Sequence, residues 1–216
     1  MSTKNKIKIY GVKQAVCTQR ILMLLEELGV TNYELVTIDM AHGEHKSDNY
    51  LKLQPFGKIP VLQDGDLILF ESRTILKYLA RKYRKLGNLF GSNIKEEAII
   101  DNWIEAEGQN YYPAIMPLLY ELVFNKFKDP NAIPNQDIVN ESLQKFNDIL
   151  DVYEKRLEGR EYIALDHFTI ADLSYVPYSA CLVKAGLLSP FVSHPNVNAW
   201  LNRLYDRESW KKVTSS

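Results

Sequence analysis

The chain has 216 residues, enough for one large domain or two small ones with an ample core. Its 26 basic and 27 acidic residues nearly balance, so neither a nucleic acid nor an anionic membrane is expected as a partner. Its two cysteines, Cys17 and Cys181, lie far apart, which argues against a disulfide framework or a cysteine-based metal site.

The N-terminal residues lead directly into a strand pattern, without an apolar signal segment. No apolar run approaches the ~20 residues that a membrane-spanning helix needs. We therefore expect a soluble protein of a reducing compartment, the cytoplasm.

The first part of the chain is predicted to be an α/β unit. The alternation of apolar and polar residues predicts a half-buried strand over 7–10, and a second strand is predicted over 33–38. Between them, apolar residues at helical spacing predict a helix from Val16 to Leu28, with Gly29 as its stop. A strand, a helix and a strand in so few residues imply a right-handed parallel crossover.

A hairpin and a helix complete this unit. The hairpin strands are predicted over 61–63 and 67–70, turned by Asp64-Gly65, which makes the sheet mixed. The helix is predicted over 72–83 and buries Ile75, Tyr78 and Leu79.

The remainder of the chain is helical in pattern. Helices are predicted over 94–127, with a break at Pro130 and Pro134, and over 137–157. Thr169 to Asp172 form a capping box at the start of another helix, and a last helix is predicted over 196–205. The expected organisation is therefore a first domain over 1–84, a linker over 85–93 and an all-helical domain over 94–216.

The segment from Gln54 to Leu62 carries the clearest functional signal. Pro60, immediately before a strand, removes one ladder donor and indicates an edge strand or a cis bond. Either leaves the backbone of Ile59 available to pair with a ligand. The helix that begins at Ser72 directs free N–H groups to the same place, which favours a peptide-like anion as the guest.

These motifs together resemble the cytosolic glutathione transferases, and in detail their phi class. The resemblance covers nearly the full chain and rests on four motifs in the family's order and spacing. They are Gly43-Glu44-His45-Lys46-Ser47, Gln54-Pro55-Phe56-Gly57, Asp64-Gly65-Asp66-Leu67 and Phe70-Glu71-Ser72-Arg73. The resemblance implies a thioredoxin-like domain with a mixed sheet, joined to an all-α domain.

The resemblance also implies a glutathione site and no metal. His45, Lys46 and Lys58 would reach the glycyl carboxylate. Ile59 would pair its N–H and C=O with the cysteinyl backbone, with Pro60 cis. At the γ-glutamyl end, Glu71 would take the ammonium and Ser72 the carboxylate. A tripeptide with two carboxylates needs such donors at both ends and a strand edge between them.

Each of these residues also has a purely structural interpretation. Ser72 alone would most simply be an N-cap, and Pro60 alone an edge-strand stop. His45 and Lys46 in a polar loop would ordinarily be solvated. The joint occurrence of these residues in the family's order favours the site.

The position of the sulfur-activating residue departs from the family's pattern. Phi-class members carry a Ser there, and counting back from Arg20 gives Ala15, which has no hydroxyl. Thr18 could direct its hydroxyl to the sulfur or bond its own helix. Cys17 could form a mixed disulfide with glutathione, or could be a small buried apolar residue.

The second substrate is expected between the domains, where pockets usually form. Aromatic candidates for the walls of this pocket would suit flat hydrophobic ligands such as flavonoids. For some of the candidates, an equally good alternative is that they form a stripe of residues in the protein core. Pro113 and Pro117 imply a helix that bends or begins anew there. The candidates are Val12, Lys13, Tyr111, Tyr112, Ile115, Met116 and Tyr120.

Three functions follow from the resemblance. The first is a homodimeric transferase that conjugates glutathione to electrophiles or reduces peroxides. The second is a carrier that keeps the glutathione site but does little chemistry, similar to the flavonoid-binding members of the class. The third is thiol exchange through Cys17.

Overall fold

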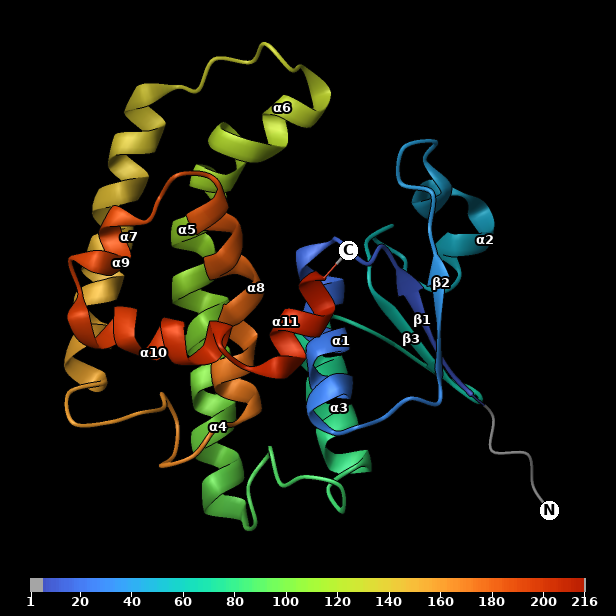
Figure 1. Ribbon diagram of the computed structural model, residues 1–216. Coiled ribbons are helices and arrows are strands. Elements are labelled where there is room, and N and C mark those ends of the chain that lie inside the picture. The colour runs from blue at the N-terminus through green and yellow to red at the C-terminus, as the bar shows by residue number, and fades with distance from the viewer. Residues whose placement is uncertain (1–5, 216) are drawn as a thin grey trace. The chain divides into compact units, whose positions relative to one another are not determined.

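The computed structural model describes residues 6–215, and residues 1–5 and 216, which the expected domains include, lie outside this range. The chain forms two compact units, Met1–Phe90 with Arg207–Ser216, and Gly91–Asp206. The expected division differs, because it assigned 85–90 to a linker and 207–216 to the helical domain. The segment from Arg207 joins the first unit because its helix packs along α1 (Figure 1).

The first unit contains a four-stranded mixed sheet in the order β2-β1-β3-β4. β1 pairs in parallel with β2 and β3 pairs antiparallel with β4, as predicted, and β1 also pairs antiparallel with β3. The elements of this unit are β1 (Ile7–Gly11), α1 (Val16–Glu27), β2 (Tyr33–Thr37), η1 (Glu44–Lys46), α2 (Asp48–Leu51), β3 (Val61–Asp64), β4 (Leu67–Phe70), α3 (Ser72–Lys82) and α11 (Glu208–Thr214).

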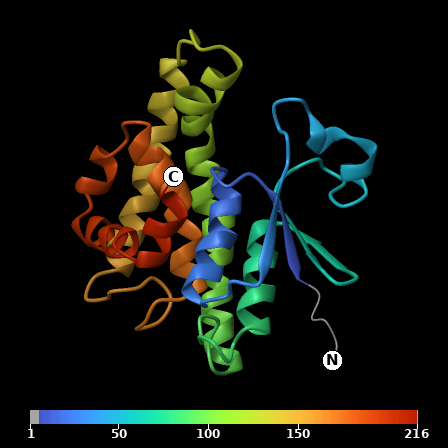
Figure 2. The same cartoon turned by 45° about the vertical axis from the view of Figure 1, so that its right-hand side comes forward.

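Two helices of this unit lie side by side, α1 and α3, as Figure 2 shows. α1 buries the apolar residues that its periodicity marked, and it ends as expected with Gly29 at φ 62°. The short α2, which the sequence did not predict, is anchored by Tyr50. The Tyr50 ring is buried against Ile38 and Val61. The 44–51 segment is therefore tied to the sheet at the start of β3.

Three details of the hairpin and its helix differ from the predictions. Asp64 pairs with Leu67, so the turn residues are Gly65 and Asp66, and Gly65 supplies the positive φ of 62°. β3 is an inner strand, so the alternative of an edge strand at Pro60 is wrong. Tyr78 is only partly buried, because its hydroxyl reaches outward to donate to Asp64 Oδ2 at 2.6 Å.

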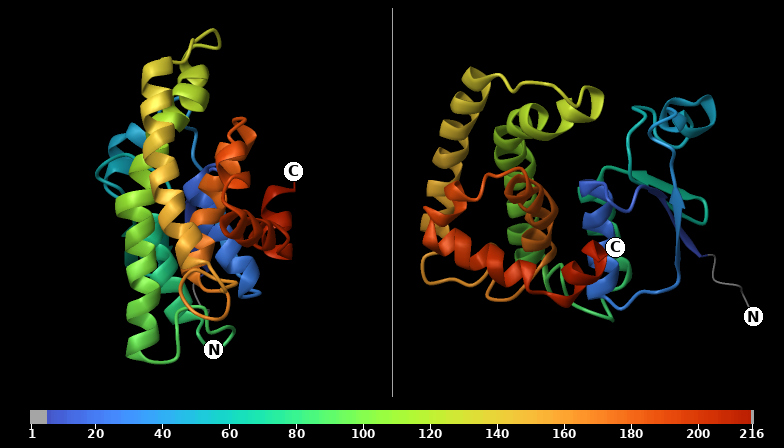
Figure 3. Two further views of the ribbon diagram at one scale, coloured as in Figure 1. Left: turned by 90° about the vertical axis from the view of Figure 1, so that its left-hand side faces the viewer. Right: turned by 45° about the horizontal axis from the view of Figure 1, so that its top comes forward.

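The second unit is helical. Figure 3 shows its first long helical run lying alongside α7, and the contacts between α5 and α7 agree. Its elements are α4 (Ile94–Ala106), η2 (Glu107–Tyr111), α5 (Tyr112–Leu119), η3 (Tyr120–Phe124), α6 (Asn125–Lys128), α7 (Gln136–Arg156), α8 (Ile170–Lys184), α9 (Ser189–Val192) and α10 (Pro195–Tyr205). Within residues 6–215, no helix combines the length and the apolar character needed to cross a membrane.

The prolines in the first helical run do not restart it. The chain stays helical from Ile94 to Lys128, and two wide π-type turns, η2 and η3, interrupt the α-helix. Pro113 has no N–H and its ring would crowd the carbonyl four residues back, which lies in η2. A wide turn at that point accommodates both effects, because its N–H groups bond five residues back.

An aromatic cluster forms the core of the second unit. The Tyr111 ring stacks on Tyr153 and packs edge-to-face on Tyr175, and its hydroxyl lies 2.6 Å from Ser179 Oγ. Cys181, on α8, is only partly buried. Burial nevertheless raises the pKa of the Cys181 thiol, so it stays protonated at neutral pH.

The capping box predicted at Thr169 is present, and its carboxylate also accepts hydrogen bonds from residues outside α8. Asp172 is fully buried and accepts N–H groups from Thr169 at 2.9 Å and from Ile163 at 2.7 Å. The indole N–H of Trp200 donates to it as well, at 3.0 Å. Burial raises the pKa of Asp172, while these hydrogen bonds oppose the rise. One carboxylate thus joins the start of α8, the preceding loop and α10.

Candidate functional site

The backbone of Ile59 lies unoccupied beside β3. The Ile59–Pro60 bond is cis, in agreement with one of the two sequence alternatives, and Pro60 is buried. Among the described residues, none forms a hydrogen bond to the N–H or C=O of Ile59. The ladder of β3 begins only at Val61, which pairs with Tyr10 and Phe70. An extended peptide therefore has one free donor and one free acceptor to pair with at this point.

Two polar side chains hold the loop that presents Ile59. The Tyr50 hydroxyl donates to the Lys58 carbonyl at 2.9 Å, and burial raises its pKa to about 12, so it remains a donor at neutral pH. Gln54 is fully buried, and its Oε1 accepts the Phe56 N–H at 2.6 Å. The exposed backbone of Ile59 is thus fixed from the inside of the fold.

The loops on either side of this position are packed tightly together. Gly57 has φ 58°, and a Cβ there would lie 2.6 Å from the carbonyl oxygen of His45. Only glycine satisfies both the positive φ and this close approach. The contact places η1 directly against the 54–58 loop.

Cationic and N–H donor groups gather where these loops meet. Lys46 Nζ donates to the Phe56 carbonyl at 3.0 Å, and the Lys58 side chain is exposed. The Nδ1 atom of His45 is buried and has no hydrogen-bond partner among the described residues. An unsatisfied buried nitrogen next in sequence to the Lys46 ammonium is an arrangement that a carboxylate would complete.

The start of α3 forms the other end of the site. Glu71 has φ 69° and ψ 108°, the one positive φ among the described residues other than glycine, and its side chain is exposed. This conformation places Ser72 at the first position of α3, where the free N–H groups of the helix favour an anion. Non-glycine residues held in such a conformation are often found at functional sites.

A buried arginine of α1 donates a hydrogen bond to the Ser72 hydroxyl. Arg20 is fully buried in α1, and its Nη1 donates to Ser72 Oγ at 2.8 Å. The hydroxyl therefore keeps its own proton for another acceptor. A sequence signal for this role exists, because Arg20 interrupts the apolar stripe of α1 one turn before Leu24.

The start of α1 holds the candidate sulfur-activating residues. Ala15 is the N-cap, in an extended conformation with φ −73° and ψ 129°, and makes no side-chain cap. Thr18 is fully buried, and it packs so closely on Gly11 that a Cβ there would lie 2.6 Å from its Oγ1. Its Oγ1 has no hydrogen-bond partner among the described residues, so the alternative in which Thr18 bonds its own helix is wrong, and its turn toward a ligand sulfur stays a prediction. Cys17 is partly buried, which fits neither alternative fully.

The candidate residues for a hydrophobic ligand site fall into two groups, those that are fully buried and those that are partly exposed. Tyr111 and Ile115 are fully buried in the core of the second unit, so their expected role as pocket walls is wrong and the core stripe is correct. Tyr112 and Met116 are partly buried, and Tyr120 is half-exposed. In the first unit Val12 and Lys13 are partly buried, and Lys13 Nζ donates to the Ser215 carbonyl at 2.8 Å.

The part of the chain that the structure describes contains no group of three or more His, Cys, Asp and Glu side chains arranged to hold a metal ion.

Comparison with known proteins gives matches along nearly the whole chain. Residues 5–81 match the family model "Glutathione S-transferase, N-terminal domain", and residues 111–208 match "Glutathione S-transferase, C-terminal domain". A probable glutathione S-transferase of rice, GSTF1, is 43% identical over 97% of this chain and 95% of its own length.

Solved structures agree with these matches. Glutathione transferase F2 from Populus trichocarpa has a TM-score of 0.90 and 41% identity, and the match covers 96% of each chain. Glutathione S-transferase I from maize, in complex with an atrazine glutathione conjugate, has a TM-score of 0.88 and 39% identity, covering 97% of this chain and 96% of that one.

Proposed function

Because the chain belongs to the glutathione S-transferase family, with plant phi-class relatives, we propose that it binds glutathione on its first unit and conjugates it to hydrophobic electrophiles. One observation carries the proposal to specific residues. The unpaired backbone of Ile59 lies between a cationic loop and the start of α3, and this order matches the chemistry of a tripeptide with an anionic group at each end.

Each part of glutathione has a complementary group. The glycyl carboxylate is bound by His45, Lys46 and Lys58. The cysteinyl residue pairs with the N–H and C=O of Ile59, as an added strand would. The γ-glutamyl carboxylate is bound by the Ser72 hydroxyl and the α3 N–H groups, and its ammonium by Glu71.

The reaction starts from the glutathione thiolate held near the first turn of α1. The sulfur attacks the electrophilic carbon, a carbon–sulfur bond forms, and with an aryl halide the halide departs. The thiol proton goes to solvent. Lowering a thiol pKa from about 8.5 to about 6.5 takes roughly 2.7 kcal/mol. The helix N-terminus supplies about 0.3–1 kcal/mol of this, so Ala15 leaves activation incomplete. Conjugation is slow relative to an enzyme with a hydroxyl at residue 15.

The absence of a side-chain donor at Ala15 favours a second function. A carrier needs the binding groups but not a reactive thiolate, and the binding groups lie on other elements than α1. In this function the protein holds flat hydrophobic ligands of the flavonoid type. Thiol exchange through Cys17 is the third function, and it requires that Cys17→Ser abolish activity while Ala15→Ser raises conjugation.

The hydrophobic ligand is bound by those candidates of the second unit that burial leaves accessible, Tyr112, Met116 and Tyr120. In the first unit, the candidates Val12 and Lys13 are also partly accessible. We extend the proposal to a cytoplasmic homodimer, which is the family's usual form, and the balanced charge and low cysteine content are compatible with it.

Calorimetric titration with glutathione, beside a conjugation assay with an activated aryl halide, tests the proposal. Ser72→Ala should weaken binding about tenfold or more, because it removes a hydrogen bond to a charged group. Thr74→Ala, at an exposed position of the same helix, is the matched control and should change nothing. Binding with turnover supports the transferase, and binding without turnover supports the carrier. No binding to the wild-type protein overturns both.

A further inference from the structure

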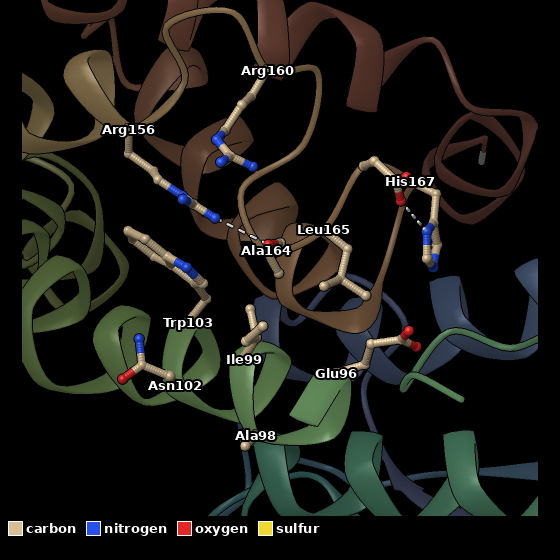
Figure 4. Close-up of a pocket in the computed structure, with 11 residues that line it drawn as sticks. Glu96, Ala98, Ile99, Asn102, Trp103, Arg156, Arg160, Ala164, Leu165 and His167 are labelled. Carbon is tan, nitrogen blue, oxygen red and sulfur yellow. Dashed lines mark hydrogen bonds and ion pairs between the residues drawn. The ribbon is translucent and has the colours of Figure 1, made fainter. Parts of the chain in front are cut away.

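The second unit contains a hollow of about 680 Å³ that the glutathione chemistry does not use. It lies between α4 and the segment that follows α7 (Figure 4). Its volume is within the range of small-molecule sites. The hollow is lined by Glu96, Ala98, Ile99, Asn102, Trp103, Arg156, Arg160, Ala164, Leu165, Asp166 and His167.

One of the two arginines that line the hollow holds neighbouring backbone segments in place. Arg156, in the last turn of α7, donates from Nε to the Ile163 carbonyl at 2.9 Å and from Nη2 to the Ala164 carbonyl at 3.0 Å. Its guanidinium also lies 5.2 Å from the centre of the Trp103 ring. Arg156 therefore fastens the 163–164 segment to the end of α7 beside Trp103 of α4, and two of its five donors are occupied.

The other arginine is available. Arg160 is exposed, and within residues 6–215 no group forms a hydrogen bond or ion pair with its guanidinium. In Figure 4 it points toward Arg156, into the same end of the hollow. The pKa of Arg156 is lowered by burial and then by the charge of Arg160. Two cationic groups at one end, one of them unpartnered, create a place where an anion is favourable.

The middle of the hollow is apolar. Figure 4 shows Ile99 and Leu165 between the arginine end and the opposite end, with Trp103 beside them. Ile99 is 42% exposed, a large fraction for an isoleucine side chain on a helix. A flat apolar body would cover Ile99 and Leu165 and remove their surface from water.

The acidic side chains that line the hollow lie at the opposite end, and each interacts with groups of the protein other than the two arginines. Glu96 accepts the Ser92 N–H at 2.7 Å and an amide N–H of Asn93 at 2.9 Å, which belongs to the capping of α4. Asp166 lies 2.8 Å from Nδ1 of His167. The two carboxylates therefore do not neutralise the arginine end, and the hollow is polarised along its length.

We propose that this hollow is a binding site for an aromatic monoanion, a carboxylate or a sulfonate, distinct from the glutathione site. The anionic group binds Arg160, and the flat ring system lies on Ile99 and Leu165 beside Trp103. Arg156 holds the 163–164 segment in place and adds positive potential, but it is not the principal partner of the anionic group.

Calorimetric titration of the full chain with 2-naphthoate and naphthalene-2-sulfonate, and with the neutral 2-naphthamide, tests this site. Both anions should bind, the amide at least about fivefold more weakly. Arg160→Ala should raise Kd for the anions about five- to tenfold. Lys155→Ala, an exposed cation one residue before Arg156 and outside the lining, is the charge-matched control and should leave Kd unchanged.

A second variant tests the apolar middle. Ile99→Glu places a carboxylate there at an exposed position, and it should abolish binding of both anions. Equal affinity for naphthoate and naphthamide, unchanged binding in both variants, or no binding of either anion to the wild-type protein would each overturn the proposal. Because none of these measurements requires glutathione, their failure is distinguishable from failure of the proposed transferase function.

Discussion

Ala15→Ser is the substitution that tests the chemistry of the site most directly. Ala15 is the N-cap of α1 and already has the extended backbone that a serine N-cap adopts, so the change requires no rearrangement. A serine hydroxyl has one proton to donate and two positions to accept. It can therefore accept a backbone N–H of the first helical turn and donate its proton to the glutathione sulfur at the same time.

The two effects have separate magnitudes. The cap should stabilise the fold by about 0.5–2 kcal/mol. The hydrogen bond to the thiolate contributes about 1.5–3 kcal/mol, which lowers the pKa of the bound thiol by about one to two units. Each unit gives about tenfold more thiolate below its pKa, but it also reduces intrinsic nucleophilicity by about threefold. We expect kcat/KM at mildly acidic pH to rise about three- to twelvefold.

The assay is the pH dependence of kcat/KM with an activated aryl halide, together with direct titration of the bound thiol by its ultraviolet absorbance. Ala15→Asp is the matched control, because aspartate caps a helix as well as serine but has no proton to donate at neutral pH. It should raise the melting temperature and also raise the pKa of the thiol. A serine variant that melts later while its bound thiol titrates unchanged would refute the reasoning.

Further predictions concern the site and the two units. Glu71→Gly relieves a positive φ that costs about 1–2 kcal/mol but adds chain entropy of about 0.5–1 kcal/mol, so the free energy of denaturant unfolding should rise by no more than about 1.5 kcal/mol. Calorimetry should show glutathione binding at least about tenfold weaker, and equal binding would remove Glu71 from the site. Asp172→Ala leaves several buried donors unpaired and should cost about 3–5 kcal/mol in urea unfolding; a loss under about 1 kcal/mol would contradict the network. Hydrogen bonds from Lys82 and Tyr78 overcome the effect of burial and hold the pKa of Asp64 below 3.8. Asp64→Asn should therefore be less stable than wild type at neutral pH. This difference should shrink as pH falls below 3.8, because the ionised form is the one stabilised; a gap that persists into acid would oppose this account.

The sequence predicted the fold well where local chemistry decides it. The parallel crossover, the glycine stop of α1 and the capping box at Thr169 all follow from short-range rules, and the structure contains each of them. The loop before β3 was predicted for the same reason, since its proline restricts the backbone wherever it occurs.

The sequence could not decide which side chains face inward. Tyr111 and Tyr112 are adjacent on one helical run, yet one lies in the core and the other is partly exposed. The helical period correctly groups Tyr111 with Ile115, but it does not say whether that face lies in the core or lines a pocket. Thr18 shows the same limit, because its burial depends on the close approach of Gly11 in a neighbouring strand.

The helix α11 has a consequence for how the protein is made. Its preceding residue, Arg207, forms two hydrogen bonds with Glu27 of α1, at 2.6 and 2.7 Å, and the Ser209 hydroxyl donates to the same carboxylate. The first unit thus draws on segments separated by more than a hundred residues of the second. During synthesis, the sheet and α1 emerge from the ribosome early but lack one packing partner until residues beyond 207 have followed. The helical unit, which is continuous in the chain, has all of its own residues outside the ribosome first.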